Sequence, residues 1–349
     1  MPLPLPAVSS PLVVAPMGGG PTTPQLVSGA GEAGAMGYLA SGYRSAEDLR
    51  EQIAEVRTLS AAPFGVNIFA PLTVEPHEQR RVAGYVDRLR PVAHALGVEP
   101  GNPVHSDDDF DAKVRTVVES RPDIVSFTFG LPPPRVVQEL HRCEIPVAIT
   151  VTDAEQAEVA CDGGADCLIV QGWEAGAHRG GLADPDAEGL ALLPLLRLVA
   201  SGSPVPVVAT GGIADGAAVA AVLAAGASAA MLGTAFMRCP EAGTAPAHAA
   251  ALTRRHPTAI TRAFTGRSAR GLTNRFLERF SAVAPAAYPE VHNATAPLRA
   301  AARRRGDLDN LHLWAGQAHE LAEALPVGEL VARMTREAKD ALARAATVL

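Results

Sequence analysis

The sequence has little cysteine and no concentration of positive charge. Its 349 residues carry a formal net charge of −7 at pH 7. No long basic run supports nucleic-acid binding. The four cysteines form no CxxC pair and no metal-ligand pattern with histidine, so we expect no metal site and a reducing compartment. They are Cys143, Cys161, Cys167 and Cys239.

Signals for secretion, for membrane insertion and for several enzyme classes are also missing. The segment from Met1 to Pro6 has no basic region and is interrupted by prolines, so it is not a signal peptide. No apolar stretch of membrane-spanning length is free of Gly, Pro or charge. We therefore expect a soluble cytoplasmic protein. The sequence contains no serine nucleophile elbow, HExxH or Walker A pattern, and no GxGxxG follows the first strand. These absences argue against a Rossmann dehydrogenase.

The main pattern that is present is an alternation of short apolar runs with amphipathic helical windows. Continuous apolar strands between helices predict a parallel sheet covered on both faces. Eight such units favour an α/β fold of the (β/α)8 TIM-barrel type, and the alternative is an open α/β sheet with one strand miscounted. The expected strands are Leu12–Pro16, Gly34–Leu39, Phe64–Phe69, Ile124–Phe129, Val147–Val151, Cys167–Val170, Val205–Thr210 and Ala229–Leu232.

Two regions interrupt this alternation and predict a smaller second unit. Residues 71–119 are longer than a barrel connection requires, and residues 241–319 are rich in Ala and Arg with helical character. Because these segments follow the third and eighth strands, they are expected to emerge on one face and to pack together as a helical lid. The barrel would comprise residues 1–70, 120–240 and 320–349, and its last helix would begin near Val327.

The loop from Val170 to Gly181 is the strongest functional signal. It follows an expected strand and contains Gln171, Glu174 and His178 among several glycines. Loops at the carboxyl ends of barrel strands are where catalytic groups are found. The ordinary pKa of histidine lies near neutrality, so His178 is the candidate proton acceptor or donor. Glu174 is either a supporting residue or a helix cap, and Trp173 either lines a pocket or packs.

Three further strand ends carry polar or glycine-rich segments. Ala15-Pro16-Met17-Gly18-Gly19-Gly20 exposes backbone that could lie against a flat ring, or it is a flexible loop. Gly211, Gly212, Gly233 and Thr234 follow the last two strands, where barrels commonly bind phosphate through amides and a helix N-terminus; the alternative is a pair of tight turns. No Lys or Arg lies between Thr210 and Thr234.

A buried amide and a short basic segment complete the candidates. Asn67 lies within the third strand and must be hydrogen-bonded there, either to a ligand ring edge or inside the barrel. Arg303 to Arg305 are followed by Asp307 and Asp309 and predict a solvated helix end. Other histidines, such as His77 and His141, lie in helical surroundings and are expected at the surface or in packing.

Taken together, these segments resemble the nitronate monooxygenase family, formerly called 2-nitropropane dioxygenases. The resemblance rests on Ala15-Pro16-Met17, Phe64-Gly65-Val66-Asn67, the loop from Val170 to Gly180, Ala209-Thr210-Gly211-Gly212-Ile213 and Leu232-Gly233-Thr234, and Leu313-Trp314-Ala315-Gly316-Gln317 extends it toward the C-terminus. Flavin-dependent enoyl-acyl-carrier reductases share most of these motifs.

The resemblance implies FMN bound at the carboxyl ends of the barrel strands and His178 as the catalytic residue. It implies oxidation of alkyl nitronates by O2 to a carbonyl compound and nitrite, which would be a detoxifying reaction. We expect the protein to be a monomer or a homodimer. Flavin contacts would come from Asn67, Gln171 and Gly176 with the Ala15, Pro16, Met17 and Gly18 segment. Phosphate contacts would come from Gly211, Gly212, Gly233 and Thr234.

The chain departs from the family pattern at two positions. Thr128 stands where many members of the best-known class have histidine, and Ala177 replaces the second glycine of Gly-Gly-His. A threonine cannot act as a base at neutral pH, so Thr128 leaves the substrate open. The alternatives are an NAD(P)H-dependent enoyl-thioester reductase on the same barrel and a flavin-binding protein without nitronate turnover.

Overall fold

The structure is a computed structural model that describes residues 8–72, 74–184 and 188–348. The prediction for Met1 to Pro6 lies outside the described residues.

The centre of the fold is a closed barrel of eight parallel strands, in the order β1-β2-β3-β4-β5-β6-β8-β9. Its closing pair joins β1 to β9 with Val14 opposite Leu232. The barrel strands are β1 (Leu12–Val14), β2 (Met36–Ala40), β3 (Phe64–Phe69), β4 (Ile124–Thr128), β5 (Val147–Val151), β6 (Cys167–Gln171), β8 (Val207–Thr210) and β9 (Ala229–Leu232). The predicted (β/α)8 barrel is confirmed, because each of the eight expected runs overlaps one of these strands.

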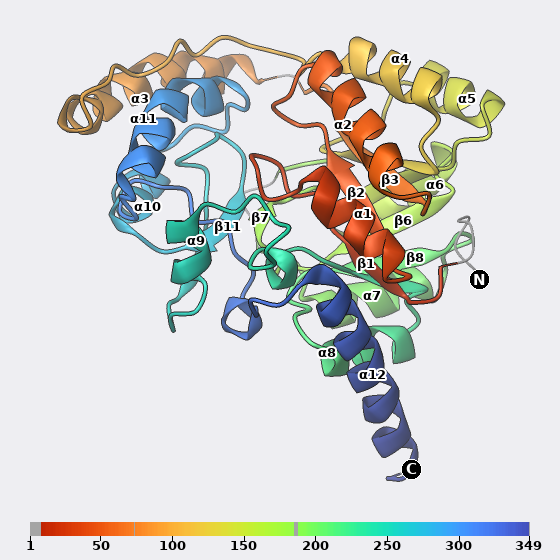
Figure 1. Cartoon of the computed structure of the whole chain (residues 1–349). Helices are drawn as coiled ribbons and strands as arrows, with labels where there is room; N and C mark the ends of the chain where they lie inside the picture. Colours follow the sequence, from red (N-terminus) through yellow and green to blue (C-terminus); the bar gives the residue numbers. More distant parts are fainter. Residues whose placement is uncertain (1–7, 73, 185–187, 349) are drawn as a thin grey trace.

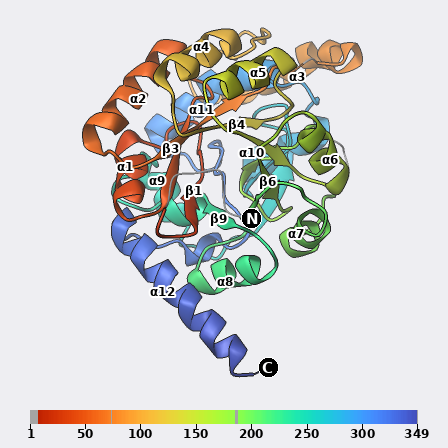
Figure 2. The same ribbon diagram turned by 90° about the vertical axis from the view of Figure 1, so that its right-hand side faces the viewer.

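Helices surround the barrel and cover its outer face (Figure 2). They are α1 (Pro24–Glu32), α2 (Ala46–Leu59), α4 (Phe110–Ser120), α5 (Pro134–Arg142), α6 (Ala154–Asp162), α7 (Leu192–Ala200), α8 (Gly216–Ala224) and α12 (Val327–Ala346). Helices α2, α6 and α8 each have a side-chain N-cap. Ser45, Asp153 and Asp215 each accept a hydrogen bond from a backbone N–H of the first turn. The last helix, α12, packs against α8 and α1, and its end extends away from the barrel (Figure 1).

A second apolar core joins two segments that are far apart in the sequence. Helix α3 (Pro76–Ala95) lies against α11 (Glu290–Arg305), with α10 (Arg275–Phe280) beside them (Figure 1). Tyr85 from α3 donates a hydrogen bond of 2.6 Å to the carbonyl of Ala263. Helix α4 instead packs on α2 and β3, within the barrel core. The division into a barrel and a second unit remains our proposal, and these contacts favour placing α4 with the barrel.

The segment after β9 is not wholly helical, which corrects the sequence-based expectation. Besides α9 (Pro246–Ala251) and the 3-10 turns η1 (Thr234–Phe236), η2 (Ser281–Val283) and η3 (His319–Leu321), it contains β10 (Thr258–Thr261) and β11 (Ala269–Leu272). These strands form an antiparallel sheet with β7 (Ala177–His178) in the order β10-β11-β7. Strand β11 pairs with its neighbour β10 and with β7 in a distant loop, and the second pairing joins segments too far apart for a local sequence pattern to reveal it.

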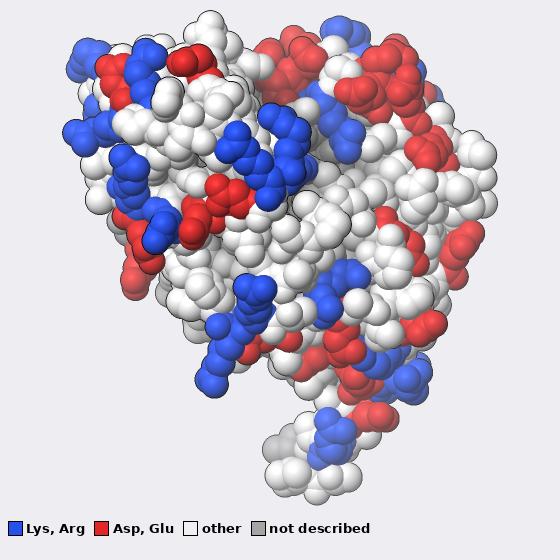
Figure 3. Space-filling model, turned by 60° about the vertical axis from the view of Figure 1, so that its left-hand side comes forward, with Lys and Arg blue, Asp and Glu red and all other residues white. Residues whose placement is uncertain are grey.

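The surface carries charges of both signs. Figure 3 shows Lys and Arg as well as Asp and Glu side chains spread in small groups over one face of the molecule. None of the helices in the described part of the chain is both long enough and apolar enough to cross a membrane.

Candidate active site

The last inward-facing residues of the barrel strands form the floor of a pocket. Successive residues of a strand point to opposite faces, so Val13 and Ile169 fill the barrel interior while Val14 and Val170 pack against the helices. The next inward positions lie at the carboxyl ends of the strands and line the pocket: Asn67, Thr128, Thr150, Gln171, Thr210 and Met231. The pocket therefore occupies the face of the barrel where enzymes of this fold place their chemistry.

All twelve site residues predicted from the sequence line this one pocket. They are Ala15, Pro16, Met17, Gly18, Asn67, Gln171, Gly176, His178, Gly211, Gly212, Gly233 and Thr234. Thr128, which departs from the family pattern, lies on the same wall. The structure thus brings the predicted set together, while the role of each residue stays a prediction.

The buried amide of Asn67 is partly used inside the barrel. Its Nδ2 donates to Ser126 Oγ at 2.9 Å and to Thr128 Oγ1 at 2.7 Å. Among the described residues, none donates to Asn67 Oδ1. One half of the amide is therefore structural, and the oxygen can accept a hydrogen bond from a ligand. Thr128 thus helps to orient Asn67.

The glycine-rich ends of β8 and β9 offer backbone donors to the pocket. Gly211 and Gly212 adopt φ values of +113° and +70°, a region that favours glycine. Within the described chain, nothing accepts a hydrogen bond from the N–H groups of Gly211, Gly212, Gly233 or Thr234. The helix α8 contributes less than expected, because Gly216 N already donates to Glu337 and Ala218 N to Asp215. The free amides are suited to an anion such as a phosphate group.

The segment after β1 presents open backbone to the same pocket. A Cβ at Gly19 would meet no atom within 4 Å, and one at Gly233 would meet nothing closer than 3.6 Å. Thr22 holds the turn, since its Oγ1 accepts a hydrogen bond of 2.8 Å from Met17 N. A ring or ribityl chain could therefore approach this backbone closely.

The loop that carries His178 is fixed by its own amide side chain. Gln171 Nε2 donates to the carbonyl of His178 at 3.0 Å, and Gly180 N donates to Gln171 Oε1 at 2.9 Å. A Cβ at Gly176 would lie 2.5 Å from Gly316 N. Gly176 is therefore required for the close approach of the C-terminal segment. The predicted flavin contact of Gln171 would have to be made beside these two bonds.

The remaining polar residues of the loop are structural. Glu174 accepts a hydrogen bond of 2.9 Å from Leu192 N at the start of α7. Of the two roles considered for Glu174, a supporting residue or a helix cap, the structure thus favours the cap. Trp173 packs between two guanidinium groups, Arg179 at 5.0 Å and Arg270 at 5.9 Å from its ring. It is not among the residues that line the pocket.

His178 lies in an aromatic and cationic environment. Its ring contacts Phe129, Tyr288 and Trp314, with centroid distances of 5.5, 5.8 and 5.7 Å. Its Nε2 lies 3.0 Å from Thr265 Oγ1. Burial lowers the pKa of His178 to about 3, and the charges of Arg267 and Arg299 act in the same direction. At neutral pH the imidazole is therefore uncharged, in surroundings that favour an added negative charge.

Sequence reasoning missed several residues of the pocket wall. His248, His312 and Arg303 line it, and Arg303 also donates to the carbonyl of Gly19 at 3.4 Å. Arg303 to Arg305 form the exposed end of α11, as expected, and Arg303 in addition reaches the pocket. These residues follow no barrel strand, so their spacing in the sequence gave no signal.

We expect the protein to lose stability in mild acid because four buried histidines stay neutral. Burial lowers the pKa of His178 to about 3 and of His248 to about 4, and lowers those of His292 and His312 well below the ordinary value. Between these values and about 6.5 the unfolded chain binds more protons than the folded one, so the free energy of unfolding falls as pH falls. Each histidine that stays neutral contributes a loss of up to about 2 kcal/mol by pH 5. Urea unfolding at pH 7.5 and 5.0 measures this difference.

The control for this prediction is a change at an exposed histidine. His312→Gln should reduce the pH dependence of the unfolding free energy, whereas His94→Gln, on the surface of α3, should leave it as in the wild type. Equal stability of the wild-type protein at the two pH values would contradict the prediction.

The family model described as nitronate monooxygenase matches residues 5–337. The nitronate monooxygenase of Pseudomonas aeruginosa is 39% identical over 95% of this chain and 96% of its own length. That of Paraburkholderia phytofirmans is 37% identical over 97% of this chain and 95% of its own length.

Solved structures give a matching result. A nitroalkane oxidase from Streptomyces ansochromogenes superposes with a TM-score of 0.94 at 42% identity, covering 97% of this chain and 98% of that one. FabK from Thermotoga maritima superposes with a TM-score of 0.75 at 26% identity, covering 98% and 96%. The first similarity is thus the stronger in both sequence and structure.

Proposed function

The chain belongs to the nitronate monooxygenase family, and from this we propose that it is an FMN-dependent oxidoreductase that converts alkyl nitronates and O2 to a carbonyl compound and nitrite. The observation that supports this most directly is that the free amides after β8 and β9 and the imidazole of His178 lie in one pocket. A phosphate-bearing cofactor and a small anionic substrate both find partners there. Such an enzyme would have a detoxifying role.

The residues of the pocket fit FMN in three places. The amides of Gly211, Gly212, Gly233 and Thr234 would bind its phosphate. The open backbone from Ala15 to Gly19 and the oxygen of Asn67 would contact the ring. When bound, FMN supplies the redox chemistry that takes electrons from the substrate and passes them to O2. The chain itself must bind and orient the substrate and control its protonation.

The charges around His178 favour an anionic substrate. Burial is the main cause of the low pKa of His178, and the charges of Arg267 and Arg299 lower it further while that of Asp184 opposes them. The two arginines together outnumber this carboxylate, so the positive potential at the ring would attract a nitronate. A bound anion would in turn raise the pKa of His178 and allow it to take up a proton. A neutral nitroalkane gains nothing from this potential, and an imidazole with so low a pKa is a weak base toward it. We therefore propose that nitronates are preferred over neutral nitroalkanes.

An anaerobic flavin titration tests the proposal. Propionate 3-nitronate is added to the purified holoprotein in one cuvette and NADPH in a parallel one, and flavin absorbance is followed. Bleaching by the nitronate and not by NADPH supports the proposed reaction. Bleaching by NADPH alone would contradict the proposed reaction and support the alternative, an NAD(P)H-dependent enoyl-thioester reductase. Failure of the protein to bind or be reconstituted with FMN would overturn the cofactor proposal.

The cytoplasmic location and the monomer or homodimer expected from the sequence remain predictions.

A further inference from the structure

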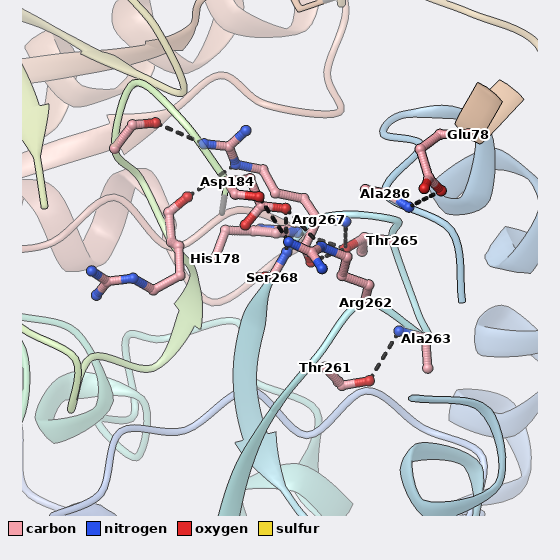
Figure 4. A network of polar contacts seen from close by, with 12 residues as sticks. Glu78, His178, Asp184, Thr261, Arg262, Ala263, Thr265, Arg267, Ser268 and Ala286 are labelled. Carbon is pink, nitrogen blue, oxygen red and sulfur yellow. Dashed lines mark hydrogen bonds and ion pairs between the residues drawn. The ribbon is translucent and has the colours of Figure 1, made fainter. Parts of the chain in front are cut away.

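The side chain of His178 is supported by a turn that comes from outside the barrel. The turn joins β10 to β11 and contains Thr265, Gly266 and Arg267 (Figure 4). Thr265 is 1% exposed and Arg267 is 4% exposed. A Cβ at Gly266 would lie 2.2 Å from the carbonyl oxygen of Ala287, so this glycine is required for the turn to pack where it does. The support is therefore rigid and sealed from solvent.

Arg267 fixes the backbone that follows His178. Its guanidinium donates to the carbonyl of Arg179 at 3.0 Å and to that of Gly181 at 2.7 Å. It also lies over the ring of Phe129, 4.4 Å from the centroid, and Phe129 N donates to the carbonyl of Gly180 at 2.9 Å. Three consecutive carbonyl groups after His178 are thus held in place.

The hydroxyl of Thr265 has one proton, and its surroundings decide where that proton goes. Its Oγ1 lies 3.2 Å from the carbonyl oxygen of Arg267 and 3.0 Å from His178 Nε2. The carbonyl can only accept, and within the described chain Thr265 is its sole hydrogen-bond donor. A hydroxyl that donated to His178 would leave this buried carbonyl without a partner, which is costly. The hydroxyl therefore donates to the carbonyl of Arg267 and accepts from His178 Nε2.

This arrangement leaves the other ring nitrogen open to the pocket. No described residue makes a hydrogen bond to His178 Nδ1, and Nδ1 is not among the polar atoms sealed from solvent without a partner. His178 lines the pocket. In a neutral imidazole that carries its proton on Nε2, the lone pair of Nδ1 faces the space where a substrate would bind.

We propose that Thr265 is a positioning residue that holds His178 as the Nε2–H tautomer, with Nδ1 as the atom available to the substrate. Arg267 supports this by holding the loop that carries the histidine. The assignment of the tautomer stands on hydrogen-bond geometry alone, whereas the use of Nδ1 rests on the proposed function. The experiment below reads the tautomer without reference to turnover, so the two can fail separately.

The test is ¹⁵N NMR of the full-length holoprotein labelled at histidine. The resonances of the His178 ring are identified by their absence from the spectrum of His178→Ala. The wild-type protein at neutral pH should show a protonated Nε2 and an unprotonated Nδ1. Thr265→Ser keeps the hydroxyl and should keep this pattern. Thr265→Val removes the hydroxyl, so the shifts should move toward a mixture of tautomers, with kcat lowered by at least about tenfold.

The matched control is Thr261→Val in β10. Thr261 is also buried, but its hydroxyl lies 2.7 Å from Ser281 Oγ and away from His178 (Figure 4). This variant should lose two buried hydrogen bonds, with Ser281 Oγ and with Ala263 N, and leave the His178 shifts unchanged. A protonated Nδ1 with an unprotonated Nε2 in the wild-type spectrum would overturn the proposal, and this result is available even if Thr265→Val does not fold. Unchanged shifts and kcat in a folded Thr265→Val would overturn it equally.

Discussion

The His178→Ala variant should keep its flavin and lose at least about 100-fold in kcat/KM on an alkyl nitronate, because a positioned proton acceptor or donor contributes about that much or more to catalysis. The imidazole lines the same pocket as the amides of Gly211, Gly212, Gly233 and Thr234. Its hydrogen bond is to Thr265, however, and not to any of these four residues. Removing it should therefore leave cofactor retention intact. Oxygen consumption with propionate 3-nitronate measures the rate, and flavin absorbance of the purified protein measures occupancy.

The control for His178→Ala is the same substitution at an exposed position. His94 lies near the end of α3 on the surface, so His94→Ala should be as active as the wild type. If His178→Ala oxidised the nitronate within about twofold of the wild-type rate, the histidine would have no part in the reaction. The chain would then be a flavoprotein whose rate depends on binding alone.

The second large effect is expected from a carboxylate placed among the amides that we propose bind the phosphate of FMN. Gly233 has a φ of −105°, and a Cβ there meets nothing closer than 3.6 Å, so Gly233→Asp should fold. Its carboxylate would face the phosphate of FMN, and a like-charge contact of this kind costs several kcal/mol. The Kd for FMN should therefore rise by about 100- to 1000-fold. Titration of the apoprotein with FMN, followed by flavin fluorescence, gives the Kd.

Two control variants show whether the effect of Gly233→Asp comes from its charge at this position, and not from the added size or from a charge placed elsewhere. Gly233→Ala adds a methyl group where there is room, so it should bind FMN nearly as the wild type does. Gly202→Asp adds the same charge at an exposed turn, where a Cβ meets no atom within 4 Å, and should also bind normally. Tight FMN binding by a folded Gly233→Asp would show that the phosphate lies elsewhere.

Sequence reasoning was sufficient for the barrel and for twelve of the residues that line its pocket. The strands are recognisable because each is a continuous apolar run between helices, as Cys167–Gln171 illustrates. The site residues come together because the carboxyl ends of parallel strands meet at one end of a barrel, whatever the distance between them in the sequence. Residues as far apart as Met17 and Thr234 could therefore be assigned to one pocket.

The residues that support His178 and that the sequence did not reveal lie in the segment between β9 and α12. Thr265 and Arg267 act through a turn between two short strands whose partner, β7, is a two-residue strand in the His178 loop. Their role depends on a pairing between distant segments and on which carbonyl groups remain free in the folded state. Neither leaves a periodic pattern in the sequence. For the same reason Glu174 could be assigned as a helix cap only from the structure.

The pairing of β7 with β11 has a consequence for the synthesis of the chain. Thr265 follows His178 by 87 residues. At a translation rate of roughly 5 to 20 residues per second, the loop that carries His178 leaves the ribosome several seconds before its supporting turn. The wall formed by Trp314 and Gly316 emerges later still. We expect nascent chains to assemble the ring of barrel strands first and to acquire flavin only when synthesis is nearly complete.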